Sequence, residues 1–164
     1  MITITEFEYE FEQEYPKASE LLKKGGLTVH EGVQKITLHG SRGPKGGFRD
    51  DSDLDVSLIV DTGQYPDIKH DAELAKEILY ATLANWHDNV KLDLTIVFDI
   101  RGCKLVCFNE PQYATGVCTA AGGIDCFGMF RIEDGIPDYV INASTNIKSI
   151  YPCIVIWRNL RSAW

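Results

Sequence analysis

Residues 38–42, LHGSR, and residues 52–56, SDLDV, decide how this chain folds. The first stretch is typical of a strand that ends in a tight Gly-Ser turn, and the second leads into the apolar run VSLIV at 56–60. Successive side chains of a strand point to opposite faces of the sheet. We therefore expect Asp53 and Asp55 to share one face, while the apolar residues beside them point into the core.

The paired aspartates indicate a cation site next to a phosphate site. Two neighbouring carboxylates repel each other unless a cation lies between them. Mg²⁺ is typically held by one or two carboxylates together with substrate phosphates. The preceding turn suits a phosphate, because Gly40 lets the backbone turn tightly and Ser41 can cap a helix whose first amides attract an anion.

This arrangement resembles the signature of the DNA polymerase β-like nucleotidyltransferase superfamily. That signature is an apolar residue, Gly-Ser, roughly ten further residues, and then Asp-apolar-Asp-apolar. Gly40-Ser41 and the DLDV run at 53–56 supply it here, and Asp93 in VKLDLTIV at 90–97 matches the third carboxylate, which the family places on a later, neighbouring strand. The resemblance covers about residues 33–98, and the order, spacing and strand context together are more specific than any single piece.

The resemblance implies an α/β (α+β) fold with a nucleotidyltransferase-type mixed β-sheet flanked by helices. We expect one domain over residues 1–164, with a catalytic core at about 30–100 and a strand-rich C-terminal extension at about 101–164. The implied reaction moves a nucleoside monophosphate from a nucleoside triphosphate to an acceptor hydroxyl and releases pyrophosphate. In the implied site the carboxylates of Asp53, Asp55 and Asp93 hold two Mg²⁺ ions, or Mn²⁺. The turn and the loop that follows it bind the triphosphate through Gly40, Ser41, Arg42, Lys45 and Arg49.

The loop at 42–49 carries three basic side chains, which belong to Arg42, Lys45 and Arg49. Arg42 follows the Gly-Ser turn directly, which favours a role in binding phosphate. For Lys45 and Arg49 a solvated basic loop is an equally good interpretation. Pro44 and the loop glycines predict that the connection is a loop or, at most, a short irregular helix.

Hydrophobic periodicity predicts the remaining elements. Helical spacing indicates an amphipathic helix at about 6–24, which Pro16 is expected to disturb, and another at about 68–87. Alternating or β-branched runs indicate strands at 33–39 and 91–98, and the family order places the later strand beside the 54–60 strand. Beyond residue 99 we expect strands at 104–108, 127–132 and 154–157, a loop at 111–123 and one helical turn at 147–152. This extension is too short and too rich in strand-like runs for the helical bundle that many antibiotic-modifying relatives carry.

Charge and cysteine content limit the partners and the compartment. The 164-residue chain has a formal net charge of −8 and a pI near 4.9, which disfavours tight, non-specific binding to nucleic acid. A nucleotide and a small-molecule or protein acceptor are therefore favoured over a nucleic-acid acceptor. The chain shows five cysteines, no secretory signal and no run long enough to span a membrane, so we expect a cytoplasmic protein with reduced thiols.

Two other interpretations stay open. Small nucleotidyltransferase domains similar to this one act as antitoxins that bind a small helical toxin and in some cases nucleotidylate it. The chain could also be a plain α/β domain whose three aspartates are surface residues. Two common motifs are excluded: Lys45 is not followed by the residues of a P-loop, and Val56 occupies the position where a calcium loop needs glycine.

Overall fold

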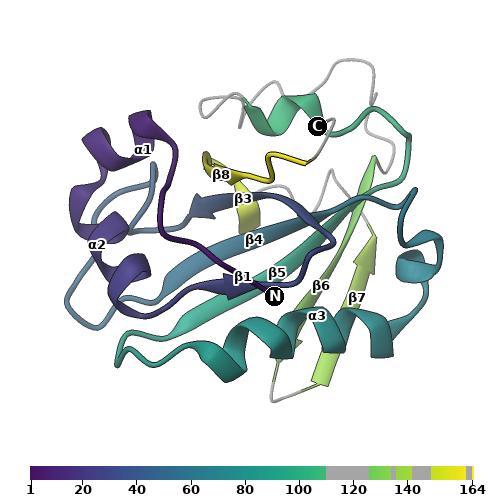
Figure 1. Ribbon diagram of the computed structural model, residues 1–164, viewed down its shortest axis with the longest axis horizontal. Coiled ribbons are helices and arrows are strands. Elements are labelled where there is room, and N and C mark those ends of the chain that lie inside the picture. The colour runs from purple at the N-terminus through teal and green to yellow at the C-terminus, as the bar shows by residue number, and fades with distance from the viewer. Residues whose placement is uncertain (110–125, 134–135, 142–148, 162–163) are drawn as a thin grey trace.

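The computed structural model describes residues 1–109, 126–133, 136–141, 149–161 and 164. Its centre is a six-stranded sheet in the order β7-β6-β5-β4-β3-β8 (Figure 1). The β4–β5 pair is parallel and the other neighbouring pairs are antiparallel, so the sheet is mixed, as predicted. The strand bounds are β3 Val33–His39, β4 Leu54–Val60, β5 Leu92–Asp99, β6 Phe127–Glu133, β7 Ile136–Ile141 and β8 Ile154–Arg158. A separate two-stranded sheet joins β1 (Ile2–Thr3) to β2 (Thr28–Val29).

The N-terminal helix is divided in two. The helix predicted at 6–24 is interrupted where a disturbance near Pro16 was expected: α1 spans Tyr9–Glu14 and α2 spans Pro16–Lys24. Proline has no N–H group and is tolerated only in the first turn of a helix, so Pro16 opens α2 instead of continuing α1. Tyr15 leaves the helical region at φ −130° and ψ 58°, and its amide bonds to Phe11 at 2.8 Å to close α1.

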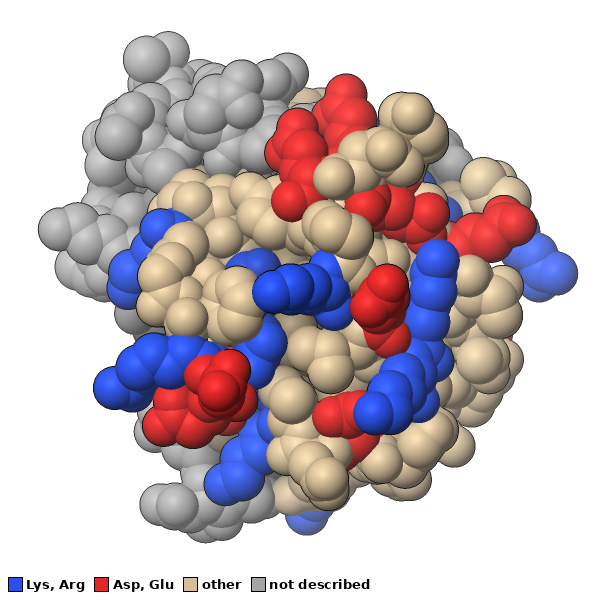
Figure 2. Space-filling view, turned by 90° about the vertical axis from the view of Figure 1, so that its left-hand side faces the viewer, with Lys and Arg blue, Asp and Glu red and all other residues tan. Residues whose placement is uncertain are grey.

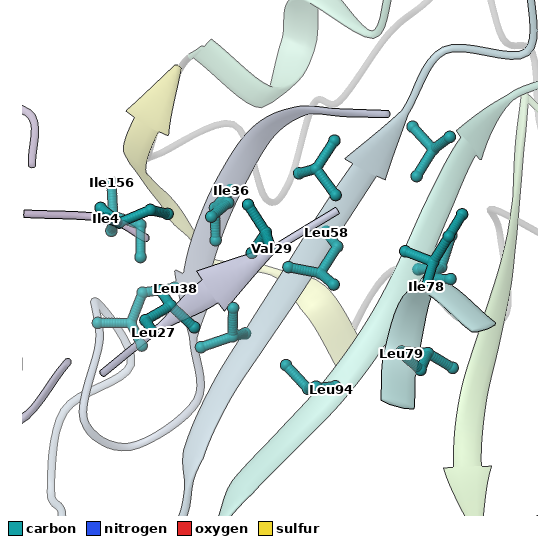
Figure 3. Packing of buried hydrophobic residues seen from close by; sticks show 14 of the residues in the cluster. Ile4, Leu27, Val29, Ile36, Leu38, Leu58, Ile78, Leu79, Leu94 and Ile156 are labelled. Carbon is teal, nitrogen blue, oxygen red and sulfur yellow. The ribbon is translucent and has the colours of Figure 1, made fainter. Parts of the chain in front are cut away.

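A crossover helix makes the parallel pair possible, because two parallel strands cannot be joined by a hairpin. Helix α3 (Ala72–Asn85) begins later than the predicted residue 68 because Asp71 caps it, accepting bonds from the amides of Glu73 and Leu74. The 3₁₀ turn η1 (Pro66–Lys69) precedes it. Ile78 and Leu79 of α3 face the strands in the main core, which Figure 3 shows in close-up.

The two faces of the sheet are covered differently. Alternate residues of β3, β4 and β5 build the main core beneath the helices, and Leu54 and Val56 are fully buried there, as predicted. On the other face, Ile59 and Val97 join an apolar cluster with residues from η2 (Val106–Asn109) and from 150–153. This cluster covers the ends of β4 and β5. The polar residues on the same face lie at the beginning of these strands.

The C-terminal extension belongs to the same sheet. Strands β6 and β8 confirm the predictions at 127–132 and 154–157, and they lie beside β5 and β3 respectively. The strand predicted at 104–108 is wrong: Asp99 accepts bonds from the amides of Arg101, Gly102 and Lys104, and this turn leads into η2. Strand β7 was not predicted. The expected loop at 111–123 and residues 147–148 of the predicted helical turn lie outside the described residues, while Ser149 and Ile150 are helical.

No helix among the described residues combines the length and the apolar character that crossing a membrane requires.

Candidate functional site

Two aspartates meet across the parallel strand pair. The register of β4 and β5 places Asp55 directly opposite Asp93, so both side chains lie on the same face of the sheet. Both residues are partly buried. Asp53 precedes β4, is exposed, and lies close enough for its charge to raise the pKa of Asp55. Of the three predicted metal ligands, the structure therefore brings Asp55 and Asp93 into direct contact and leaves Asp53 beside them.

The carboxylates cannot all be charged without cost. Burial raises the pKa of Asp55 to about 7, and its raised value also reflects the charge of Asp93, a hydrogen bond with Asp93 and the charge of Asp53. Arg131 acts in the opposite direction. Like charges held together in a partly buried place take up a proton or a cation to relieve their repulsion. The pair is thus ready to exchange a proton for a metal ion.

The carboxylate donors fit a hard divalent cation whose remaining coordination positions are filled by water and a bound ligand. Within the part of the chain that the structure describes, no group of three or more His, Cys, Asp or Glu side chains forms a ready-made metal site. Mg²⁺ often uses only one or two carboxylates and takes its other ligands from water and substrate phosphates. Asp55 and Asp93 can supply that pair, and the charge of Asp53 acts on Asp55 from beside them.

The Gly-Ser turn lies against the carboxylate pair. His39, the last residue of β3, pairs with Asp55, and Gly40 follows at φ +71°. A Cβ atom at Gly40 would collide with the Asp55 carboxylate, so only glycine lets the turn pass this close. The connection is a loop, as predicted, and Ser41 caps no helix: residues 41–45 form turns in which the Gly43 amide bonds to the Gly40 carbonyl at 3.1 Å.

Arg42 is buried and braces the loop that connects β3 to β4. Its Nε donates to the Ser52 carbonyl at 2.8 Å and its Nη2 to the Asp50 carbonyl at 3.2 Å. The guanidinium also lies over the Phe48 ring, 4.8 Å from its centroid. Because Ser52 immediately precedes Asp53, Arg42 fixes where β4 begins. The guanidinium therefore stabilises the backbone of the loop through these hydrogen bonds. Its direct contact with a phosphate stays a prediction.

The other two predicted phosphate ligands are exposed. Lys45 and Arg49 lie on either side of the loop tip, and Arg49 forms an ion pair with Asp51 at 3.4 Å. Gly46 and Gly47 adopt φ values of +73° and +81° with open space around them. The loop tip thus extends away from the sheet and carries its cations into solvent, where a phosphate chain could reach them.

Two further residues border the site, and the sequence analysis gave no role to Arg131. His39 is buried, and its Nε2 lies 3.0 Å from Ser57 Oγ. Arg131 of β6 pairs with Thr95, two residues beyond Asp93, and its Nη2 lies 4.0 Å from Asp93 Oδ2. Alternation in the predicted strand at 127–132 gives Arg131 no signal, because it shares a face with the apolar residues Phe127 and Met129, and only the order of the strands shows that it faces the carboxylates.

His39 makes the stability of the fold depend on pH. The pKa of His39 is lowered to about 4, mainly by burial and then by the charge of Arg131, while a hydrogen bond to the Ser149 backbone acts in the opposite direction. Between pH 6.5, the ordinary pKa of histidine, and pH 4, His39 binds a proton in the unfolded chain but not in the folded chain. The free energy of unfolding should therefore fall by about 2 kcal/mol between pH 6.5 and 4.5 because of this residue alone.

Urea denaturation at both pH values, on the wild type and on His39→Gln, measures this contribution. The variant should lose less stability on acidification than the wild type does. Equal losses in the two proteins would show that His39 is protonated in the folded state and would contradict the assignment.

Comparisons with known proteins add little to this geometry. No protein-family profile matches the chain, and no curated protein is detectably similar to it. Among solved structures, a candidate nucleotidyltransferase from Sulfolobus solfataricus matches over 53% of this chain and 70% of its own, with 17% sequence identity and a TM-score of 0.32. A similarity of this size does not assign the chain to a family.

Proposed function

We propose that this chain is a Mg²⁺-dependent nucleotidyltransferase, which moves a nucleoside monophosphate from a nucleoside triphosphate to an acceptor hydroxyl. One observation carries the proposal: Asp55 and Asp93 lie opposite each other across parallel strands, directly against a Gly-Ser turn that a side chain at Gly40 would block. A carboxylate pair and a backbone turn without side-chain obstruction are what a metal-bound phosphate chain requires.

The triphosphate would lie between the turn and the loop tip. Amides of the turn at Gly40 and Ser41 would bind its β- and γ-phosphates, and the exposed cations Lys45 and Arg49 would neutralise their charge. Arg42 would contribute indirectly, since it holds the loop against the start of β4. The α-phosphate would then lie over Asp55 and Asp93.

The chemical step is an in-line displacement. The oxygen of the acceptor hydroxyl attacks the α-phosphorus, the bond from that phosphorus to the bridging α–β oxygen breaks, and pyrophosphate leaves toward the turn. The hydroxyl proton passes to a carboxylate, and Asp93 is the candidate base. Mg²⁺, once bound, supplies positive charge that stabilises both the attacking and the leaving oxygen. The protein supplies mainly position and charge, because phosphoryl-type transfer needs little covalent help.

The surface charge favours a small molecule or a protein hydroxyl over a nucleic acid as the acceptor. Figure 2 views the end of the molecule at which α1 and α2 lie, where lysine and arginine side chains are interspersed with aspartate and glutamate. Tight binding to nucleic acid needs a continuous basic surface. Mixed charges on this end and the net charge of −8 favour an acceptor that is not a polyanion.

Thermal unfolding with each of the four ribonucleoside triphosphates, with and without Mg²⁺, tests the proposal. A ligand present at about 100 times its Kd stabilises the folded state by about 2.7 kcal/mol, which raises Tm by roughly 5–10 °C for a domain of this size. We expect this rise only with Mg²⁺, and we expect Asp53→Asn to lose it because the variant removes a charge from beside the pair.

Asp67→Asn is the matched control, because Asp67 is exposed in η1 and its substitution removes the same negative charge at a position away from the site. It should keep the full Mg²⁺-dependent rise. No rise with any triphosphate in the wild type would refute the proposal. That result would favour the alternative in which the domain acts by binding a small helical partner protein.

A further inference from the structure

Arg131 reaches the carboxylate pair from the side opposite the Gly-Ser turn. Across one face of the sheet, the turn follows β3, Asp55 lies on β4, Asp93 on β5 and Arg131 on β6. The sheet order therefore places the two carboxylates between the turn and the guanidinium. Any group bound over the carboxylates has the turn on one side and Arg131 on the other.

The guanidinium is only loosely held. Its distance of 4.0 Å from Asp93 Oδ2 is longer than a hydrogen bond, and both side chains are about one third exposed. Asp138 of β7 pairs with Arg131 across the strands, but no ion pair joins these two side chains in the described structure. Arginine carries five N–H donors in a planar fork. Among the described residues Arg131 forms no other ion pair, so donors remain for a ligand.

The charge of Arg131 acts on the whole width of the site. It lowers the pKa of Asp55 on β4 and that of His39 on β3, so its potential extends from β6 across the carboxylates toward the turn. A metal ion on Asp93 would take over the carboxylate that Arg131 now faces. The guanidinium would then be free for the nearest anion, which in an in-line transfer is the phosphate that reacts.

We propose that Arg131 binds the α-phosphate of the nucleotide from the β6 side, opposite the Gly40–Ser41 turn. This inference rests on the proposed function and adds to it a residue that contacts the reacting group. The guanidinium fork matches two phosphate oxygens, which a lysine ammonium cannot do in the same way. The contact would orient the α-phosphorus toward the acceptor and stabilise the charge on its oxygens during transfer.

Calorimetric titration with a nucleoside and its 5′-monophosphate, both in Mg²⁺, isolates the α-phosphate. The base is the one that gives the largest thermal shift with triphosphates. In the wild type we expect the monophosphate to bind at least about 10-fold more tightly than the nucleoside. In Arg131→Gln the monophosphate should bind about 10- to 100-fold more weakly, as for loss of charged hydrogen bonds, while nucleoside binding is unchanged.

Two further variants distinguish the geometry of the guanidinium group from its positive charge. Arg131→Lys keeps the charge and should recover only part of the affinity for the monophosphate. Full recovery of the wild-type affinity would show that Arg131 acts only as a counter-ion and would overturn the bidentate contact. Lys17→Gln removes a positive charge from exposed α2 and should leave both affinities unchanged.

The outcomes distinguish this inference from the proposed function. Equal monophosphate affinity in the wild type and Arg131→Gln, or no preference of the wild type for the monophosphate, would overturn the role of Arg131. Either result could occur with full Mg²⁺-dependent stabilisation by a triphosphate, which would leave the proposed function in place. A lower melting temperature of Arg131→Gln with an unchanged ratio of the two affinities would likewise overturn it, because the residue would then be purely structural.

Discussion

Asp55→Asn should reduce Mg²⁺-dependent nucleotide transfer by more than about 100-fold and, at the same time, stabilise the free protein above pH 7. The loss of transfer follows from the position of Asp55, which faces Asp93 in the parallel register and contacts it. An amide cannot provide the negative charge that a divalent cation requires. The gain in stability follows from the repulsion that the amide removes.

The pH dependence of this gain has a defined sign. Burial raises the pKa of Asp55 to about 7 from an ordinary value of 3.8, so the folded chain holds a proton in that interval that the unfolded chain has lost. The free energy of unfolding therefore falls as pH rises from about 4 to 7, and the cost is complete above pH 7. Because solvent screens a partly exposed group, we expect about 1–2 kcal/mol of added stability in Asp55→Asn at pH 8 and almost none at pH 4.

Urea denaturation at pH 4 and pH 8 without metal measures the gain, and pyrophosphate release measures the loss of transfer. Asp67→Asn again provides the control for a charge removed elsewhere. If Asp55→Asn were less stable than the wild type at pH 8, the crowding of carboxylates would not exist in solution. If it kept wild-type transfer, Asp55 would not be a metal ligand.

The alternation of side chains explains why much of this site could be predicted. A strand has a period of two, so the sequence at 52–60 already showed that Asp55 faces away from Leu54 and Val56, and burial confirms it. The strand order was accessible only through the family resemblance, because periodicity does not say which strands are neighbours. The exact Asp55–Asp93 pairing depends on the register that the crossover through α3 sets.

Longer-range features had no signal of their own. The buried guanidinium of Arg42 binds carbonyls 8 and 10 residues further along, and a linear reading of a basic loop suggests a solvated or phosphate-facing side chain instead. Arg131 lies 38 residues after Asp93 and meets it only because β6 lies beside β5. The break at Pro16, by contrast, was visible in the sequence, because proline disturbs a helix anywhere beyond its first turn.

Gly40→Ala should be the most disruptive small substitution near the site. At φ +71° any residue with a Cβ atom is strained, and here that atom would also collide with the Asp55 carboxylate. The strain costs about 1 kcal/mol and the overpacking about 1–3 kcal/mol, so we expect the free energy of unfolding to fall by about 3 kcal/mol. Because Asp55 must move, Mg²⁺-dependent stabilisation by nucleotide should be lost as well.

Gly46 provides a matched control for the backbone strain. Its φ of +73° is almost the same, but nothing lies within 4 Å of the position that a Cβ atom would take. Gly46→Ala should therefore cost only about 1 kcal/mol and leave nucleotide binding intact. The difference between the two variants measures the close approach of the turn to the carboxylate, free of the general cost of a positive φ.

A double-mutant cycle then assigns that difference to Asp55. In an Asp55→Ala background the carboxylate is gone and only the Cβ atom of residue 55 stays close, at 3.1 Å, so Gly40→Ala should cost little more than Gly46→Ala does, and the two sites should show a coupling of about 2 kcal/mol. Urea denaturation of the four proteins gives this value directly. If the cost of Gly40→Ala stayed at about 3 kcal/mol without the carboxylate, the glycine would serve the backbone alone, and the turn would have no close contact with the site.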